Sequence, residues 1–492
     1  MNYSDLLDLL NSYSLALATM GYDAQTIAPK DGAAYRNKAM AILAGEHFKL
    51  LTSDEADTAL TEASQSNNWI TQEGSKYLLK ELKKIKDIPH DEYVAFQELV
   101  NNAQISWETA RDKKDYNLFK DDLHSIIETH KKLIDYRKSN LSVYDESLND
   151  YEEGLRMESV EAFFKVLEDE LVPHLDTMIE AQAQRPAFLD AYVSTEKQRL
   201  ISEIVMEHIG YSKNFGYLTE TAHPFSSTFS INDTRITTHY QEHAFTQNIF
   251  SVIHEIGHSM YNHQVNPDFE GTPLADNMSM SMHESQSRFL ENIIGRSKEF
   301  WTPLYPKLQN IIPEVLSDVN LDEFVFGINY IERNPIRIDS DEVTYPLHIM
   351  VRYNIEKKIL VENASVDTLN TLFAQEMTRL IGITPENDSQ GILQDVHWSG
   401  ASFGYFPTYA LGSAYAAQFY EAMKKDIDVE ALLLEGNLSE IFKWLHENIH
   451  QYSGTIETQE LIKKVTGESF NPNYFVDYLK NKYSLLLGIA FD

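Results

Sequence analysis

Apolar residues recur three and four positions apart along most of this chain, with charged and polar residues between them. Residues 160–182 show the pattern clearly. In an α-helix this spacing places the apolar side chains on one face, where they can pack against a neighbouring element. The pattern therefore predicts a mostly α-helical fold.

The helical pattern stops at about residues 215–245. β-branched residues and turn formers replace it there, and residues 234–240 alternate in a way that predicts a short strand. Helical spacing resumes at about residue 246, and a second break at residues 271–277 precedes another helix. We therefore expect a small sheet set among the helices.

Glycine and proline mark no linker along the chain. They number 20 and 15 in 492 residues and are scattered. The sequence also has no internal repeat and no low-complexity tract. These observations favour a single unit over residues 1–492. A division of this unit into two helical lobes that flank a cleft stays open.

The composition allows a large core and narrows the possible chemistry. Hydrophobic residues make up 43% of the chain, with 27 tyrosines and 24 phenylalanines, but there is no cysteine. This excludes disulfides, a thiolate nucleophile and a Cys-ligated metal. The first residues lack the basic region of a secretory signal, and no apolar run is long enough to cross a bilayer. We expect a cytoplasmic protein with no membrane partner.

The net charge of −34 is spread along the sequence. A field of this sign repels phosphate backbones, so we expect no nucleic-acid partner. The simplest interpretation of the charge is solubility, and a preference for cationic substrates is an alternative.

The strongest chemical signal is a pair of histidines four residues apart, His254 and His258. On an α-helix they lie about 40° apart around the axis and one turn apart along it, so both imidazoles can reach one ion. Glu255 follows the first histidine and sits on the flank of that face. This arrangement is the H-E-x-x-H motif of zinc hydrolases.

Each residue type in the motif suits metal-assisted hydrolysis. Neutral imidazole binds zinc, and a site with three protein ligands leaves a position open for water. The carboxylate of Glu255 can take a proton from that water and pass it to the leaving amine. The flanking residues are strongly apolar and predict a buried helix, on which two histidines and a glutamate need partners. The alternative is that both histidines are hydrogen-bonded core residues.

The third ligand must come from another segment. Tyr261 and Gln264 occupy the positions where an extended motif would place glycine and a third histidine. Glu284 lies 26 residues after His258 on a separate expected helix, where a packed helix pair could present its carboxylate to the metal. A solvent-exposed helical glutamate is the alternative interpretation.

The histidine ligands should also have orienting partners. Zinc-bound histidines usually donate their second N–H to a carboxylate or a carbonyl. One turn beyond Glu284 the sequence has Arg288 instead of a carboxylate. Asp276 and Asp341 are therefore the candidates, and the sequence does not choose between them.

Several motifs in order give the chain a more specific resemblance. A segment at residues 20–36 has Tyr22-Asp23 where a Trp-Asp pair is usual. This segment and six further motifs, taken in order, resemble the thermostable carboxypeptidase 1 (Taq carboxypeptidase) family of metallopeptidases. The motifs are HPF at 223–225, DTRIT at 233–237, HEIGH at 254–258, HESQ at 283–286, IRIDSDEVTYPLHI at 336–349 and GILQDVHW at 391–398.

The resemblance implies a metallocarboxypeptidase that releases single C-terminal residues from peptides with broad specificity. It implies a large helical fold with a deep central groove and a small β-sheet beside the active site, similar to neurolysin and angiotensin-converting enzyme. One Zn²⁺ per chain is implied, with Co²⁺ or Mn²⁺ as alternatives, in a metal-binding core at about residues 220–412. The partners implied are peptides with a free C-terminus and a second copy of the chain in a homodimer.

The resemblance also implies roles for individual residues. His254, His258 and Glu284 would be the metal ligands, and Glu255 the general base and acid. For each of the other candidates a purely structural role is the alternative to a functional one. The arginines could form an ion pair with a nearby aspartate, and the aromatic residues could serve only in packing. The candidates are Arg337, Arg235 and His223 for substrate binding, and His397, Tyr405 and Tyr409 for stabilising the oxyanion.

Two other functions remain to be separated from this one. An oligoendopeptidase of similar helical fold would share the H-E-x-x-H motif and a distant glutamate. A non-enzymatic helical binding protein with a structural metal would need a closed site, usually with four ligands and often cysteine. The absence of cysteine and the presence of Glu255 beside the ligands argue against that second alternative.

Overall fold

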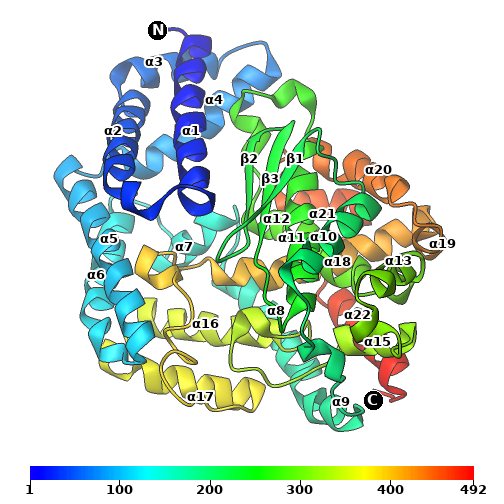
Figure 1. Cartoon of the computed structure of the whole chain (residues 1–492). Coiled ribbons are helices and arrows are strands. Elements are labelled where there is room, and N and C mark those ends of the chain that lie inside the picture. Colours follow the sequence, from blue (N-terminus) through cyan, green and yellow to red (C-terminus); the bar gives the residue numbers. More distant parts are fainter. Residues whose placement is uncertain (492) are drawn as a thin grey trace.

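The structure is a computed structural model of the chain, and it describes residues 1–491. Helices form most of it, and a three-stranded sheet lies among them (Figure 1). This confirms the mostly helical fold with a small sheet. The helices before the sheet are α1 Tyr3–Thr26, α2 Ala33–Leu51, α3 Asp54–Ala63, α4 Trp69–Ile85, α5 His90–Lys113, α6 Lys120–Asp135, α7 Val143–Tyr151, α8 Met157–Glu170, α9 Leu175–Ala181 and α10 Thr195–Ile209.

The helices after the sheet include those at the centre of the molecule. A π-helical turn, η7 Phe289–Ile294, continues directly from α12. The helices are α11 Phe245–His263, α12 Met280–Arg288, α13 Lys298–Ile311, α14 Pro313–Leu316, α15 Leu321–Ile328, α16 Tyr345–Leu360, α17 Leu369–Ile381, α18 Phe406–Asp426, α19 Val429–Leu434, α20 Ser439–Asn448, α21 Thr458–Thr466 and α22 Asn473–Leu487.

Short 3₁₀ turns connect many of these helices. One of them, η3, interrupts residues 160–182, so this segment does not form the one continuous helix that its apolar spacing suggests. Pro173 cannot supply the amide hydrogen that a continuing helix needs, so α8 ends at Glu170 and α9 begins at Leu175. The turns are η1 Lys30–Gly32, η2 Tyr116–Leu118, η3 Val172–His174, η4 Ala187–Asp190, η5 Pro267–Phe269, η6 Pro273–Asp276, η8 Arg337–Asp339, η9 Val366–Thr368, η10 His397–Gly400 and η11 His450–Tyr452.

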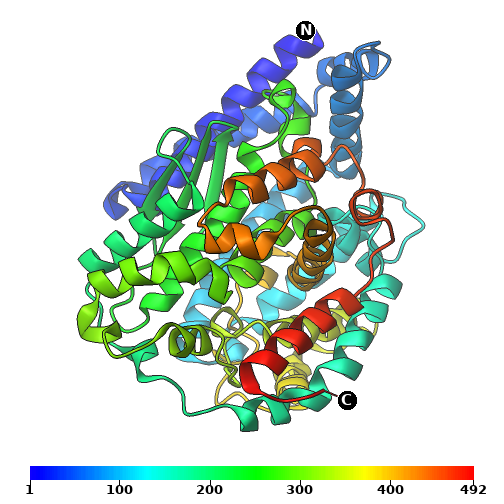
Figure 2. The ribbon, with the colours of Figure 1, turned by 90° about the vertical axis from the view of Figure 1, so that its right-hand side faces the viewer.

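The sheet consists of β1 Gly216–Glu220, β2 Ser226–Ser230 and β3 Asp233–Thr238, in the order β1-β3-β2. β1 runs parallel to β3, and β2 pairs antiparallel with β3 as an edge strand. The sheet lies between α1 and α11 (Figures 1 and 2). On one side Tyr22 of α1 hydrogen-bonds Thr219 at 2.7 Å, and on the other Ser259 of α11 donates to Thr234 at 2.6 Å. This contact ties the sheet to the helix that carries the histidine pair.

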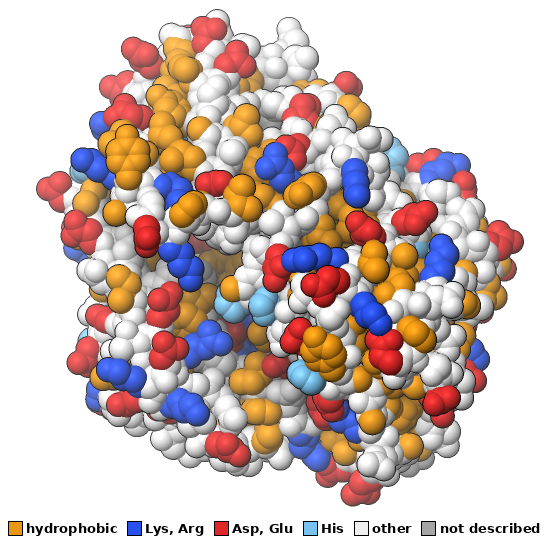
Figure 3. Space-filling model, viewed as in Figure 1, with side chains coloured by type: hydrophobic (Ala, Val, Ile, Leu, Met, Phe, Trp, Pro, Cys, Tyr) orange, Lys and Arg blue, Asp and Glu red, His pale blue; other side chains and the backbone are white. Residues whose placement is uncertain are grey.

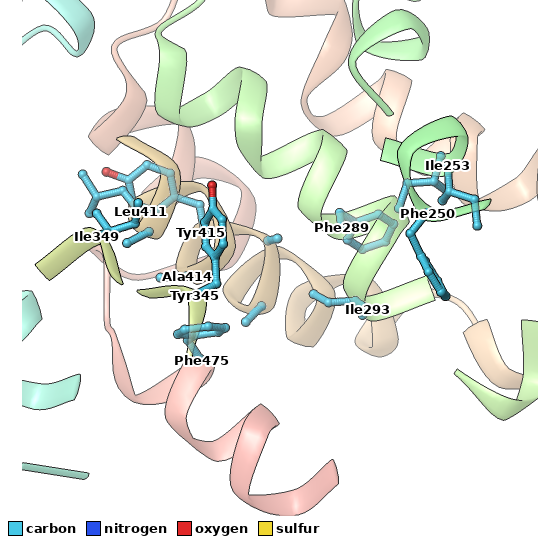
Figure 4. Close-up of a cluster of buried hydrophobic side chains, with 14 of the residues drawn as sticks. Phe250, Ile253, Phe289, Ile293, Tyr345, Ile349, Leu411, Ala414, Tyr415 and Phe475 are labelled. Atoms are coloured by element: carbon cyan, nitrogen blue, oxygen red, sulfur yellow. The ribbon is translucent and has the colours of Figure 1, made fainter. Parts of the chain in front are cut away.

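Most of the buried apolar side chains belong to one cluster, which extends from Ala103 to Tyr483. Figure 4 shows part of it, where α11, η7, α16, α18 and α22 meet. A second, small cluster joins α1 and α3 near the N-terminus. Among the described residues, no helix is both long and apolar enough to span a membrane.

Candidate metal centre

The two histidines of the motif lie on one face of α11, as the spacing predicts. The ring centroids of His254 and His258 are 4.9 Å apart, and the rings are nearly perpendicular. The opposite face of α11 is held in the core by buried residues such as Ile249, Ile253 and Ile256. The packing therefore fixes the direction in which the imidazoles point.

Glu284 on α12 completes a cluster of three possible ligands. Its Oε2 lies 3.8 Å from Nε2 of His254 and 3.5 Å from Nε2 of His258, and the three ligand atoms all lie within 4.8 Å of one another. Two ligands of a tetrahedral zinc ion, each about 2.1 Å from the metal, lie about 3.4 Å apart. Two nitrogens and one carboxylate oxygen at these distances fit a divalent ion.

The three possible ligands differ in exposure. The face of the molecule seen in Figure 1 has a hollow near its centre (Figure 3). Glu284 is 5% exposed, whereas His254 and His258 are only partly buried. The ligands therefore combine a buried carboxylate with imidazoles that are still accessible.

Two glycines let three helices approach one another at this site. A Cβ on Gly257 of α11 would lie 2.6 Å from backbone atoms of Gln286 and Ser287 in α12. A Cβ on Gly412 of α18 would lie 2.7 Å from Cβ and Cγ of Glu284. Real Cβ atoms do not approach this closely, so both positions need glycine to keep Glu284 beside the histidines.

We expect Gly412→Ala to destabilise the fold by about 1–3 kcal/mol, because the added methyl group overpacks the α12–α18 contact. It should also weaken metal binding, because it displaces Glu284. Thermal unfolding and metal titration measure the two effects. Gly45→Ala in α2 is the matched control, since its Cβ would meet nothing within 4 Å and alanine favours the helix. Equal melting temperatures for Gly412→Ala and the wild type would contradict the packing role.

Arg288 explains why no carboxylate stands one turn beyond Glu284. Its Nε donates to Oε1 of Glu284 at 2.6 Å, and its Nη1 donates to Glu291 at 3.2 Å. The guanidinium also lies over the ring of Tyr345, 4.0 Å from its centroid. Burial opposes ionisation of Glu284, but Arg288 and the two histidines hold the pKa of its carboxyl well below the usual range. The second oxygen of Glu284 is left facing the histidines.

The partners of the two histidines differ from both sequence candidates. His254 Nδ1 lies 2.9 Å from Oε2 of Glu291, and His258 Nδ1 lies 2.5 Å from Nδ1 of His283. The expectation of Asp276 or Asp341 was wrong. Asp341 instead accepts hydrogen bonds from Val343 and Thr344, in the segment just before α16.

Asp276 also lies away from the histidines. It ends the turn η6, which packs against α4. Burial raises the pKa of its carboxyl. No contact of Asp276 with either imidazole is present in the described part of the chain, so helix packing rather than the local sequence selects the orienting groups.

Glu255 points from α11 toward the edge strand and is 7% exposed. The carboxylate lies close to Ser226, the first residue of β2. Burial raises the pKa of Glu255 above its usual value, and the neighbouring histidines act in the opposite direction. A carboxylate with a raised pKa is a stronger base, which suits a group that must accept and release one proton.

His397, Tyr405 and Tyr409 gather beside the cluster. His397 Nε2 lies 3.2 Å from the hydroxyl of Tyr409, and the rings of Tyr405 and Tyr409 are 5.1 Å apart. Burial lowers the pKa of His397 to about 4 and raises that of Tyr405 to about 12. All three groups are thus neutral near pH 7, and tyrosine hydroxyls can donate hydrogen bonds. The structure brings these candidates together on α18 and the loop before it.

The two arginine candidates both have aspartate partners. Arg337 is buried, and its Nε and Nη2 donate to Asp395 at 3.0 and 2.7 Å. Arg235 forms a two-point pair with Asp233 at 2.8 and 2.7 Å, on the face of the sheet toward Tyr22 of α1. These contacts support the ion-pair interpretation of each residue.

The three candidates for substrate binding lie on different elements, with Arg235 on β3 and Arg337 on η8. His223 is exposed in the connection between β1 and β2. Arg337 lies near Tyr409, with its guanidinium carbon 5.1 Å from the centroid of the tyrosine ring. Binding of a substrate carboxylate by any of the three stays a prediction.

Comparison with known proteins adds to this geometry. The family described as "Carboxypeptidase Taq (M32) metallopeptidase" matches residues 2–483. Carboxypeptidase 1 of Bacillus subtilis (strain 168) is 40% identical over 98% of both chains, and thermostable carboxypeptidase 1 of Pyrococcus furiosus is 35% identical over 95% of both. The crystal structure of an M32 carboxypeptidase from Deinococcus radiodurans R1 is 30% identical, with a TM-score of 0.95 over 99% of both chains.

Proposed function

This chain belongs to the carboxypeptidase Taq (M32) family of metallopeptidases and is a metallocarboxypeptidase, and we propose that its metal is one zinc ion held by His254, His258 and Glu284. The observation that carries this proposal is the convergence of two Nε2 atoms and one carboxylate oxygen within 4.8 Å. Such a donor set also accepts Co²⁺ or Mn²⁺, so the family requirement is for a divalent metal and zinc is the specific proposal.

A bound zinc ion would polarise the scissile carbonyl and make a nearby water more acidic. Glu255 is placed beside the ligands without being one of them. We assign it the proton transfers: its carboxylate accepts a proton from the attacking water and then delivers that proton to the amine of the leaving residue.

The tyrosines and His397 are proposed to stabilise the negative charge that develops on the carbonyl oxygen. Tyr405 and Tyr409 supply neutral O–H donors, and His397 fixes Tyr409 through the 3.2 Å hydrogen bond. Recognition of the C-terminal carboxylate is proposed for Arg337, with Arg235 as the second choice, and His223 is proposed as a further substrate-binding residue. The arginines would have to share their guanidinium groups with the aspartates that they already contact.

Other properties are proposals of a broader kind. We propose that residues 1–492 act as one peptidase unit with a metal-binding core at about residues 220–412. We also propose a deep central groove like that of neurolysin and angiotensin-converting enzyme, and the hollow in Figure 3 supports it. The broad specificity, the homodimer and the cytoplasmic location stay predictions from the resemblance and the composition.

The reaction can be tested with one unblocked peptide followed by mass spectrometry over time. We expect a ladder of products that each lack one more C-terminal residue, because the family is a family of carboxypeptidases. A chelator should stop the ladder, and added Zn²⁺ should restore it.

The matched control is the same peptide with an amidated C-terminus. An exopeptidase that recognises a free carboxylate should leave it intact. Internal cleavage of both peptides would instead identify an oligoendopeptidase. A ladder that persists at full rate after the metal has been removed would contradict the metal-dependent mechanism.

A further inference from the structure

Each histidine of the metal centre has one nitrogen turned toward Glu284 and one turned away from it. The Nε2 atoms lie 3.8 and 3.5 Å from Oε2 of Glu284, so they are the atoms that can bind an ion. The Nδ1 atoms of His254 and His258 face partners behind the site. A neutral imidazole carries a proton on only one nitrogen, so the partner at Nδ1 decides whether Nε2 is free to bind.

The partner of His254 is Glu291, which is 9% exposed. Arg288 and Arg296 donate to this carboxylate at 3.2 and 3.3 Å. An ionised carboxylate can only accept hydrogen bonds, so the 2.9 Å contact requires a proton on Nδ1 of His254. Nε2 is then left with its lone pair directed at the site.

Glu291 reaches His254 from an unusual stretch of helix. It lies seven residues after Glu284, which on an α-helix is close to two full turns and the same side. It belongs to the π-helical turn η7, which begins directly after Arg288 and ends with a bond from Gly295 N to Leu290 O at 2.8 Å. Such turns occur often at functional sites. One continuous helical segment thus presents both the proposed ligand Glu284 and the carboxylate behind His254.

The partner of His258 is a second imidazole, that of His283. The two Nδ1 atoms are 2.5 Å apart, so a single proton lies between them. If Nε2 of His258 binds the ion, that proton belongs to Nδ1 of His258, and Nδ1 of His283 accepts the hydrogen bond. The proton of His283 is then on its Nε2, which lies 3.3 Å from Oδ1 of Asn262.

The same direction of donation continues beyond His283. Oδ1 of Asn262 accepts a hydrogen bond from Nε2–H of His283, and Nδ2 of Asn262 donates to Oγ1 of Thr228 at 2.6 Å. Asn262 lies on α11 and Thr228 on β2. The hydrogen bonds in this series therefore all donate in the same direction, from His258 toward the edge strand β2, and no charged group takes part in them.

We infer that Glu291 and His283 are positioning residues for the metal centre, with an ionised carboxylate behind His254 and a neutral imidazole behind His258. This inference rests on the proposed function, because it assumes that both Nε2 atoms bind the metal. The two ligands therefore differ in donor strength, since a carboxylate partner makes an imidazole more basic than a neutral partner does. Neither residue touches the substrate or the reacting atoms.

Four variants test the roles separately. Glu291→Gln keeps an oxygen acceptor but removes the charge. His283→Leu removes the acceptor, whereas His283→Asn keeps an oxygen near the place of Nδ1 and has a shape similar to leucine. Glu342→Gln is the control, because Glu342 is a buried glutamate paired with Lys482 at 2.5 Å and contacts neither ligand.

The readout is the affinity of each folded chain for Zn²⁺ or Co²⁺, measured by competition with a chromophoric chelator. We expect Glu291→Gln and His283→Leu to bind about 10- to 100-fold more weakly than the wild type. His283→Asn and Glu342→Gln should keep affinities close to that of the wild type. The visible spectrum of the Co²⁺ form should shift in Glu291→Gln and stay unchanged in Glu342→Gln, because only the first changes the donor strength of a ligand.

Three results would overturn the inference, and they can be told apart by including Glu284→Gln. If that variant loses the metal while Glu291→Gln and His283→Leu keep wild-type affinity, the metal centre stands and the positioning roles do not. If none of the three binds more weakly, the proposed metal centre fails as well. If His283→Asn binds as weakly as His283→Leu, the acceptor at Nδ1 is not what His283 provides.

Discussion

Glu255→Gln is expected to lower kcat by about 10²- to 10⁴-fold, the usual contribution of general acid–base catalysis. The amide has nearly the shape of the carboxylate but cannot accept the proton of the attacking water. Glu255 is not one of the three possible metal ligands, so the metal affinity of Glu255→Gln should remain close to that of the wild type. Steady-state kinetics on a short peptide, together with the metal content of the same sample, checks both statements.

Stability provides the control for Glu255→Gln. Burial raises the pKa of Glu255, so replacing its carboxylate with a neutral amide should leave the melting temperature unchanged or slightly raised. A variant that folds, holds its metal and still cleaves peptide at the wild-type rate would remove Glu255 from the mechanism.

Glu284→Gln is expected to lose both metal and activity. It removes the single negative charge from the ligand cluster and leaves the guanidinium of Arg288 with Glu291 as its remaining carboxylate partner. Metal affinity should fall by more than the roughly 10- to 100-fold that follows loss of an orienting partner, because a direct ligand is lost. Metal titration measures this fall, and excess Zn²⁺ should restore part of the activity.

The two glutamate variants control for each other. Both replace a buried carboxylate by an amide on neighbouring helices, so general effects of the substitution are shared. We expect Glu255→Gln to keep the metal and Glu284→Gln to lose it. Wild-type metal affinity in Glu284→Gln would mean that the ion binds elsewhere or without this carboxylate.

Local spacing was enough to predict the helix that carries the histidine pair. Four-residue separation on an α-helix fixes the relative direction of His254 and His258 whatever surrounds them. The break in helical spacing at residues 215–245 likewise located the strands. The order β1-β3-β2 did not follow from the pattern, because the pairing of strands depends on contacts between segments.

The orienting residues could be found only in part from the sequence. Glu291 was within reach, since a residue seven positions after Glu284 faces the same side of a helix. One turn after Glu284 the sequence has Arg288, so the carboxylate lies one turn further along the helix. His283 belongs to the HESQ motif, but its contact with His258 depends on the close approach of α11 and α12 that Gly257 permits.

The ion-pair partners of the two arginine candidates differ in how far they could be predicted from the sequence. Arg235 has its partner two residues away, so its ion pair with Asp233 was open to local reasoning. Asp395 lies 58 positions from Arg337 and also accepts from Arg352. A contact over that distance is set by how η8 and the loop before α18 pack, and local spacing does not show this.

Anomalous X-ray scattering from crystals of the wild-type protein, measured on both sides of the zinc absorption edge, tests the metal centre most directly. We predict one anomalous peak per chain, at about 2.0–2.2 Å from Nε2 of His254, Nε2 of His258 and Oε2 of Glu284. A peak away from these three atoms, or no peak from crystals of a fully active preparation, would contradict the proposed zinc centre.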